Sequence, residues 1–389
     1  MKEPHTADDS KRDAVASGDR VAVIGAGLSG LTCANVLQRQ GFHVHTFEKS
    51  RGLGGRMATR RREGFTADHG AVFADVRWDL PEVEGGAGEA WAAMLVDLET
   101  LGAAARWEAS GSASESASGQ ASGSAPAEAS QKVVGMPGMS SFVRPFVHGF
   151  EVNTAVEIAA IASAPTGFTL RDNADQSYGP FAHVVVAIPA AQAGALWATC
   201  GVDGDKAAAL SAIAMTPCMV AMIAFDGRLE GVEDVRANPA PNLALMVRNS
   251  AKPGRAGSGH EPPGDVWVLH ADLAWSRAHL DHSKDEIAAE LLGALRGAFP
   301  AVEGLSVTHL EGHRWRYSAA TPVSEAQRKV APQGYAAVPS VPGLYACGDW
   351  CVGPGLQAAF ASGYACACAI ADQAGLQPSL RLQLASPSA

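Results

Sequence analysis

The residues with the clearest chemical meaning lie between Gly25 and Glu48. Apolar residues 21–24 are typical of a buried strand, residues 31–40 are typical of a helix, and between them stands Gly25-Ala26-Gly27-Leu28-Ser29-Gly30. Gly25 permits a tight turn, Gly27 lets a pyrophosphate approach the backbone, and Gly30 lets helix and strand pack closely. Glu48 ends the next strand-like segment and can accept hydrogen bonds from a ribose diol. The order of these parts predicts a dinucleotide site at the helix N-terminus; the alternative is a glycine-rich turn without a ligand.

A second glycine turn follows at once. It reads Lys49-Ser50-Arg51-Gly52-Leu53-Gly54-Gly55-Arg56-Met57-Ala58-Thr59. It resembles the R-x-G-G-R-x-x-[ST] element of the flavin amine oxidase superfamily, which lies under the FAD pyrophosphate in that family. The resemblance implies non-covalent FAD, with Lys49, Gly55, Arg56 and Met57 at the cofactor. Glu48 would repel a 2′-phosphate, which argues against NADP. A solvated basic loop is the alternative reading of the arginines.

Two later segments resemble the renalase-like branch of this superfamily. Asp68-His69-Gly70-Ala71 matches most of an F-D-H-G-A strand that passes the flavin edge, and residues 313–317 match H-R-W-R-Y. The resemblance implies cofactor contacts at Gly70 and Ala71, and candidate catalytic residues at His69, Arg314, Trp315 and Tyr317. Strand alternation would place Trp315 with His313 and Tyr317, and Arg314 with Arg316 on the opposite face. The alternatives are that Asp68 and His69 only bond neighbouring backbone, and that Trp315 is simply packed beside surface arginines.

The resemblance implies further cofactor contacts later in the chain. By position, Val156 would give its backbone to the adenine. Gly348 and Asp349 match the G-D element near the ribityl chain, and Gly355, Leu356 and Gln357 open the last helix under the flavin pyrimidine. Leu356-Gln357-Ala358 departs from the family's V-E-G, which leaves the backbone role intact and removes the glutamate.

Composition excludes several classes of partner. The net charge of −10 disfavours nucleic acid and anionic membranes, and no apolar run is long enough to span a bilayer. Residues 1–19 lack the apolar stretch of a signal peptide, and seven cysteines in mostly apolar segments suit reduced thiols, so a cytoplasmic location is expected. Two pairs of cysteines are close in sequence, Cys347 with Cys351 and Cys366 with Cys368. No histidine or further cysteine stands at zinc-like spacing around them, and we name no metal ligand.

The expected fold class is α/β, with a Rossmann-like FAD-binding domain and a second, α+β substrate domain inserted in it. Residues 20–75, 131–195 and 310–375 would form the discontinuous FAD-binding domain, and residues 76–109 and 196–309 the substrate domain. Segments 1–19 and 376–389 are interpreted as a flexible leader and tail. Residues 110–130 are almost wholly Ser, Ala, Gly and Glu and are interpreted as a disordered insertion.

The resemblance implies an FAD-dependent oxidase of a small substrate, with a hydride passing to flavin N5 and O₂ reduced to H₂O₂. In renalase-like proteins the substrate is an isomeric dihydronicotinamide dinucleotide. This dinucleotide is anionic, and four arginines fall in the expected substrate half: Arg248, Arg277, Arg314 and Arg316. The first alternative is amine oxidation, for which Trp315, Tyr317 and Trp350 could form an aromatic cage. A second is a non-catalytic flavin-binding sensor or assembly subunit, and the oligomeric state is not predicted.

Overall fold

The strand that precedes the first glycine turn, β1 (Arg20–Ile24), lies inside a six-stranded sheet. Its residues Val21, Ala22 and Val23 are fully buried, as a strand covered on both faces requires. In spatial order the sheet is β18 (Ala336–Ala337), β19 (Leu344–Ala346), β12 (His183–Val186), β1, β2 (His43–Glu48) and β8 (Glu151–Thr154). All neighbouring pairs are parallel except β18–β19. This is the Rossmann-like arrangement that the sequence predicted.

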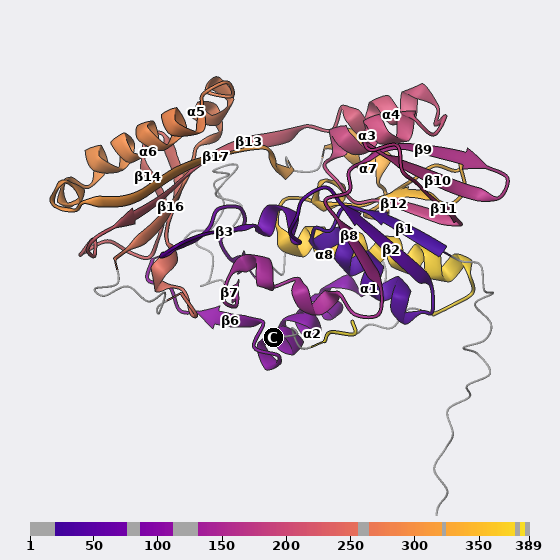
Figure 1. Cartoon of the computed structure of the whole chain (residues 1–389), viewed down its shortest axis with the longest axis horizontal. Coiled ribbons are helices and arrows are strands. Elements are labelled where there is room, and N and C mark those ends of the chain that lie inside the picture. The colour runs from indigo at the N-terminus through magenta and orange to yellow at the C-terminus, as the bar shows by residue number, and fades with distance from the viewer. Residues whose placement is uncertain are drawn as a thin grey trace, which may run out of the picture.

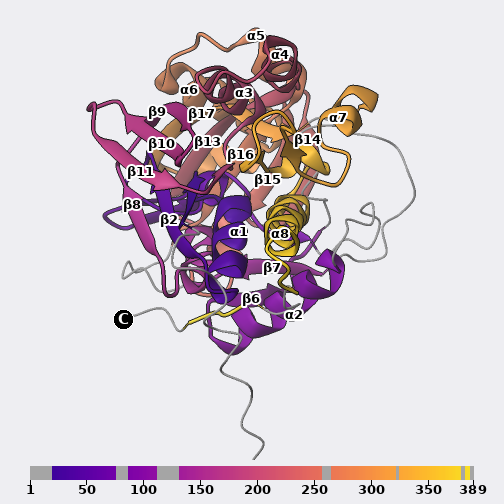
Figure 2. The ribbon, with the colours of Figure 1, turned by 90° about the vertical axis from the view of Figure 1, so that its right-hand side faces the viewer.

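Both faces of this sheet are covered. Helices α1 (Leu28–Arg39) and α8 (Leu356–Gln373) lie side by side on the face that carries Val21 and Val23 (Figures 1 and 2). The opposite face packs on a three-stranded antiparallel sheet and two helices: β9 (Ile158–Ala164), β10 (Gly167–Asp172), β11 (Ser177–Phe181), α3 (Ala190–Ala198) and α4 (Gly204–Ser211).

A five-stranded antiparallel sheet stands at the other end of the molecule (Figure 1). Its strands, in spatial order, are β14 (Val235–Ala240), β15 (Leu243–Arg248), β16 (Val266–Ala271), β13 (Met215–Phe225) and β17 (Val307–Ala320). One face packs against α5 (Leu273–Ala278) and α6 (Lys284–Ala298) through a core that includes Met219, Ile223 and Leu291. The capping box predicted from Ser283 and Glu286 is confirmed at the start of α6.

Strand β17 links this sheet to the turn that precedes α8. It pairs with β13 along its length and also packs against the 3₁₀ turn Asp349–Cys351. The domain boundary expected at residue 310 therefore falls inside one strand of the five-stranded sheet. The predicted division into domains otherwise stays a prediction.

The remaining elements lie around these sheets. They are the hairpin β3 (Thr59–Arg62) and β4 (Phe65–Asp68), the sheet β5 (Ala74–Asp75), β7 (Lys132–Gly135) and β6 (Ala104–Trp107), and helices α2 (Ala87–Thr100) and α7 (Glu325–Val330). Of these, β6, β7 and α2 lie at the lower side of the molecule in Figure 1. The amphipathic helix α2 was expected to cover the substrate domain. It packs on β6, which lies in the expected substrate domain, and on α8, where the rings of Trp91 and Phe360 lie 5.3 Å apart.

The computed structural model describes residues 20–75, 86–111, 131–255, 264–320, 324–377 and 382–385. The expected leader and most of the expected insertion and tail lie outside these ranges. Within them, no helix has the length and apolar character needed to cross a bilayer. All seven cysteines are buried and none is in a disulfide.

Candidate cofactor and substrate site

One cavity brings together the three distant parts of the chain that the motifs singled out. Its volume is about 1350 Å³, which exceeds the range of about 300–1,000 Å³ typical of small-molecule sites. Its wall includes Gly25, Gly27, Leu28, Ser29, Glu48, Lys49, Gly55, Arg56, Met57, Gly70, Ala71, Val156, Gly348, Asp349, Gly355 and Leu356. Ala26, Gly30 and Gln357, also expected at the cofactor, do not line it. The cavity has room for a dinucleotide and a second molecule.

The first glycine turn has the geometry that its spacing predicted. Gly25 has a φ of +109°, and a Cβ there would lie 2.5 Å from the Ala187 carbonyl oxygen. A Cβ on Gly30 would lie 2.0 Å from the carbonyl oxygen of Gly25, so only glycine permits this contact between helix and turn. A Cβ on Gly27 would meet no protein atom within 4 Å, and Gly27 lines the cavity. The space beside Gly27 therefore belongs to the cavity, where a ligand can approach the backbone.

The N-terminus of α1 faces this space. Gly27 is the N-cap and supplies no side chain to bond the first free N–H groups of the helix. The buried hydroxyl of Ser29 also lines the cavity and has no hydrogen-bond partner in the described part of the chain. Free N–H groups, a helix dipole and an unsatisfied hydroxyl together suit an anionic group, so these residues fit the pyrophosphate of FAD.

Glu48 connects the two turns. Its Oε2 accepts a hydrogen bond from the Ala26 N–H at 2.9 Å, and its Oε1 accepts one from the Ser50 N–H at 2.8 Å. Each carboxylate oxygen has a second lone pair, so Glu48 can also accept from a ribose hydroxyl at the cavity wall. The Val156 N–H donates to the Glu48 carbonyl oxygen at 2.9 Å. The predicted backbone contact from Val156 to an adenine would therefore have to use its carbonyl.

Arg56 does not present a lone positive charge. Its guanidinium donates to both carboxylate oxygens of Asp349 at 2.7 Å, and to the Ser318 carbonyl oxygen at 2.8 Å. This bidentate pair ties the second glycine turn to β17 and to the turn before α8. Two residues predicted separately as cofactor contacts thus position each other.

A cluster of aromatic side chains forms another part of the wall. The ring centroids of His69 and His313 lie 4.6 Å apart, and His69 stacks on Trp315 at 5.4 Å. The Trp315 Nε1–H donates to the His69 carbonyl oxygen at 2.7 Å. His270, on β16, also lines the cavity and was not expected there. Strand alternation could have indicated it, because Val266 and Val268 pack on the same side of the strand.

Burial keeps these histidines neutral. Loss of solvation lowers the pKa of His69 to about 4, with a further contribution from Arg60. Burial, followed by the charge of Lys252, lowers the pKa of His270 to about 4. Burial lowers the pKa of His313 to about 3, and His69 and Arg60 add to the shift. Nδ1 of His69 and both ring nitrogens of His270 have no hydrogen-bond partner in the described part of the chain, so they are available to a ligand or to water.

Asp68 has a structural role next to this cluster. Its carboxylate accepts hydrogen bonds from Thr59 Oγ1 at 2.8 Å, from the Met139 N–H at 2.9 Å, from Lys252 Nζ at 3.0 Å and from the Arg255 guanidinium. Burial alone would raise the pKa of this carboxyl, but Lys252 and Arg255 hold it well below its usual range. Bonding only to neighbouring backbone is therefore the wrong reading for Asp68, which joins segments far apart in sequence.

Arg314 lies outside the cavity, although it was named as a candidate catalytic residue. Its guanidinium donates to the Leu280 carbonyl oxygen at 2.6 Å and to that of His282 at 3.2 Å, behind β17. Arg316 was expected to share its face but lines the cavity. The pairing of β13 with β17 shifts register between Thr216 and Cys218, and this irregularity breaks the strict alternation on which the expectation relied.

The two other arginines expected at a substrate also lie elsewhere. Arg248 is buried and pairs with Asp234 at 3.2 Å and Asp265 at 2.9 Å. Arg277 is exposed and does not line the cavity. Of the four arginines, only Arg316 is in position to meet a ligand there.

The wall of the cavity is nevertheless basic. Its charged side chains, apart from histidine, are Lys49, Arg51, Arg56, Arg60, Arg61, Arg144 and Arg316 against Glu48, Glu157 and Asp349. Among the described residues, Arg144 and Arg316 have no carboxylate within ion-pair distance, whereas Arg60 pairs with Glu311 at 3.0 Å. A molecule with a net charge of −10 thus has a cavity that favours anions.

Comparison with solved structures shows the same fold. A protein from Exiguobacterium sp. 255-15, with a provisional assignment as protoporphyrinogen oxidase, has a TM-score of 0.63 and 15% identity, over 92% of this chain and 99% of that one. A putrescine oxidase bound to putrescine has a TM-score of 0.60 and 13% identity, over 91% of this chain and 99% of that one. At these identities the likeness concerns the fold alone.

Sequence similarity to curated proteins is short. The chain is 47% identical over 56 residues to a zeta-carotene-forming phytoene desaturase from Myxococcus xanthus, which covers 14% of this chain and 11% of that protein. The chain thus matches about a tenth of the length of such relatives.

Two family models match the chain. Residues 23–76 match an NAD(P)-binding Rossmann-like domain, and residues 89–371 match the flavin containing amine oxidoreductase family. The second match covers most of the chain and includes β17 and the start of α8, both of which line the cavity. The chain therefore belongs to the flavin containing amine oxidoreductase family, and this membership implies FAD as the cofactor.

Proposed function

We propose that this flavoenzyme oxidises an isomeric dihydronicotinamide dinucleotide, as the renalase-like resemblance implies. One dihydronicotinamide, one O₂ and one proton would give the oxidised nicotinamide and H₂O₂. The observation that carries the proposal is the surplus of positive charge in the cavity wall. The first turn accounts for an FAD pyrophosphate, and Arg144 and Arg316 remain for a second anionic molecule.

The chain's own residues would position such a substrate and exclude water. FAD, when bound, supplies a hydride acceptor at N5. Hydride transfer from a dihydropyridine needs close positioning and little acid–base chemistry. Neutral imidazoles can donate and accept a hydrogen bond at once, so His270 and His69 suit the carboxamide of a nicotinamide. The Trp315 indole offers a planar surface beside them.

Amine oxidation is the second candidate. Trp315, Tyr317 and Trp350, the residues expected to form a cage for a cation, all line the cavity. The acidic residues of the wall speak against it. Glu48 accepts from two backbone N–H groups and Asp349 pairs with Arg56, while Glu157 accepts from Asn173 Nδ2 at 2.9 Å. Asp349 is neutralised by Arg56, and the two glutamates are outnumbered by the basic side chains of the wall.

Anaerobic mixing tests the choice between substrates. Purified yellow protein is mixed with each dihydronicotinamide dinucleotide isomer and, separately, with putrescine and other amines, and flavin bleaching is followed. We expect rapid bleaching by at least one isomer. Bleaching by an amine and by no isomer would overturn the proposal in favour of amine oxidation.

Substitution of Arg316 tests whether this arginine binds the phosphates of the dinucleotide. Arg316→Gln should weaken apparent dinucleotide binding about tenfold or more, because one charge-assisted contact contributes about 1.5–3 kcal/mol. The same variant should oxidise the uncharged dihydronicotinamide riboside as the wild type does. Arg277→Gln, an exposed arginine outside the cavity, is the matched control and should leave both substrates unaffected. An equal loss with both substrates would argue against a phosphate contact.

A further inference from the structure

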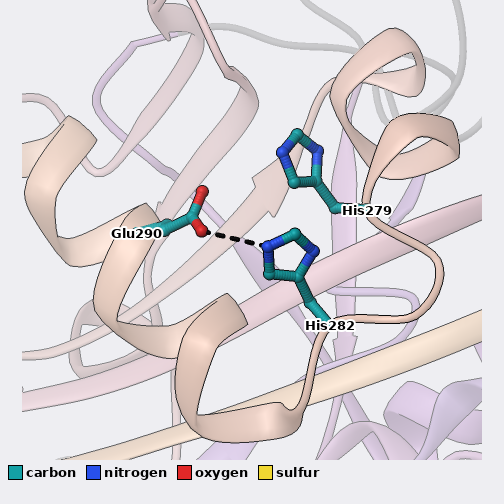
Figure 3. Close-up of side chains that lie close together, drawn as sticks. All are labelled: His279, His282 and Glu290. Carbon is teal, nitrogen blue, oxygen red and sulfur yellow. Dashed lines mark ion pairs between the residues drawn. The ribbon is translucent and has the colours of Figure 1, made fainter.

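Two imidazoles and a carboxylate converge on the outer side of the five-stranded sheet, away from the cavity (Figure 3). His279 directly follows α5, His282 lies in the loop between α5 and α6, and Glu290 lies on α6. One ligand atom from each of the three lies within 4.8 Å of the others. None of these residues lines the cavity, so the cluster is separate from the flavin site.

We propose that His279, His282 and Glu290 bind one late first-row divalent cation, for which Zn²⁺ is the probe. Nitrogen and carboxylate ligands sit about 2.0–2.2 Å from Zn²⁺, so two ligands of a tetrahedral site are about 3.3 Å apart. His282 Nε2 lies 3.2 Å from Glu290 Oε1, which matches that separation. The ligand atom of His279 lies within 4.8 Å of both, so its approach would complete a set of three ligands.

His279 is oriented for this role. Its Nδ1 lies 2.7 Å from the Trp275 carbonyl oxygen, which can only accept a hydrogen bond. Nδ1 must therefore carry the proton, and Nε2 keeps a free lone pair. A backbone carbonyl that fixes the tautomer in this way is the usual second contact of a metal-binding histidine. The Trp275 ring stacks on His279 at 4.2 Å and holds its plane.

The loop that carries His279 and His282 is also fixed from beneath. Arg314 donates to the carbonyl oxygens of Leu280 and His282, and Ser283 caps the helix that carries Glu290. This preorganisation lowers the entropy cost of collecting the ligands. It also gives Arg314 a structural role that its place beside Trp315 did not indicate.

The proposed site has an open fourth position. The His282 and Glu290 side chains are 28% and 45% exposed, so a water molecule can complete the tetrahedron. The metal would take the place of the hydrogen between His282 Nε2 and Glu290, with the His282 ring in its other neutral tautomer. It would then join the loop covalently to α6 and stabilise the outer layer of the sheet.

A binding experiment with the holoenzyme tests this site. Untagged protein is freed of metal with a chelator, titrated with Zn²⁺ against a chromophoric competitor, and melted with and without Zn²⁺. We expect one Zn²⁺ per chain and a higher Tm with the metal. Glu290→Gln and His282→Ala should each lower the affinity at least tenfold and remove the Tm shift.

A matched control separates a built site from a simple His–carboxylate pair. His45 and Glu151 also form such a pair, at 3.4 Å, and the described residues near it offer no third ligand. Glu151→Gln should therefore bind Zn²⁺ as the wild type does. FAD content, measured for every variant, shows that each is folded. Equal Zn²⁺ affinity in the wild type and in Glu290→Gln, or an equal loss in Glu151→Gln, would overturn the proposal.

Discussion

The cavity wall contains three neutral imidazole rings, those of His69, His270 and His313. Their neutrality makes the stability of the fold depend on pH. An unfolded chain exposes its histidines, which then bind protons near their ordinary pKa of about 6.5. The folded chain holds them neutral until the pH approaches 4 or 3. Between these values the unfolded state binds more protons, so acid favours unfolding.

We therefore predict that the free energy of unfolding falls as the pH is lowered from about 6.5 to about 4. One histidine contributes at most about 1.4 kcal/mol per pH unit in this window. His270→Gln should reduce the slope by up to that amount, as measured by urea unfolding at several pH values. An unchanged slope in this variant would show that His270 takes up a proton in the folded state.

Asp68 should act in a lower window. Its depressed pKa means that its contribution to stability is complete above the pKa of an unfolded aspartate, about 3.9, and is lost as the pH falls below that value. The histidines thus change the stability of the fold above about pH 4, and the Asp68 carboxylate changes it below that pH.

At the scale of elements, two glycines of the first turn have different roles, which substitutions can distinguish. Gly27→Ala adds a methyl group where no protein atom lies within 4 Å, so the fold should persist while the added group occupies the ligand's space. Gly30→Ala places a methyl group 2.0 Å from the Gly25 carbonyl oxygen, so α1 must move off β1.

We predict that purified Gly27→Ala retains the circular dichroism spectrum of the wild type and binds FAD at least tenfold more weakly, since backbone approach to the pyrophosphate is blocked. Gly30→Ala should lose several degrees of Tm, or fail to fold. FAD absorbance per chain and thermal melting measure both outcomes. Full FAD content in Gly27→Ala would mean that the pyrophosphate lies elsewhere.

The sequence was most informative where backbone geometry is dictated by residue type. The glycine turns were predictable because their close backbone contacts require residues without a Cβ. Strand β1 was predictable because its run of apolar residues indicates continuous burial. The expectation that Arg316 shares a face with Arg314 is wrong because a register shift in β17 cannot be read from alternation. Arg248 is paired with Asp234, which directly precedes β14, and with Asp265, which directly precedes β16. Such pairings depend on tertiary contacts between distant segments.

At the scale of the whole molecule, the charge of the cavity wall has the opposite sign to the net charge of the chain. The chain carries a net charge of −10, whereas the cavity wall carries more basic than acidic side chains. The local field at the cavity should dominate for an anion that has entered it, and salt should screen that attraction.

We predict that kcat/KM for a dihydronicotinamide dinucleotide falls as ionic strength is raised from low to physiological values. The uncharged riboside should show little dependence and serves as the control. A rise with salt would show that repulsion by the acidic surface outweighs the basic wall. An amine substrate would be expected to gain from salt, since screening relieves its repulsion by the wall.

The neighbouring positions of α1 and α8 (Figure 2) have a bearing on biosynthesis. Gly363 of α8 comes so close to α1 that a Cβ there would lie 2.0 Å from the Ser29 carbonyl oxygen, beside the turn that faces the cavity. Among the helices of the described residues, the cofactor pocket thus combines the first and the last to leave the ribosome. A nascent polypeptide halted before residue 356 should stay colourless, and yellow colour during expression would report that translation has passed through α8.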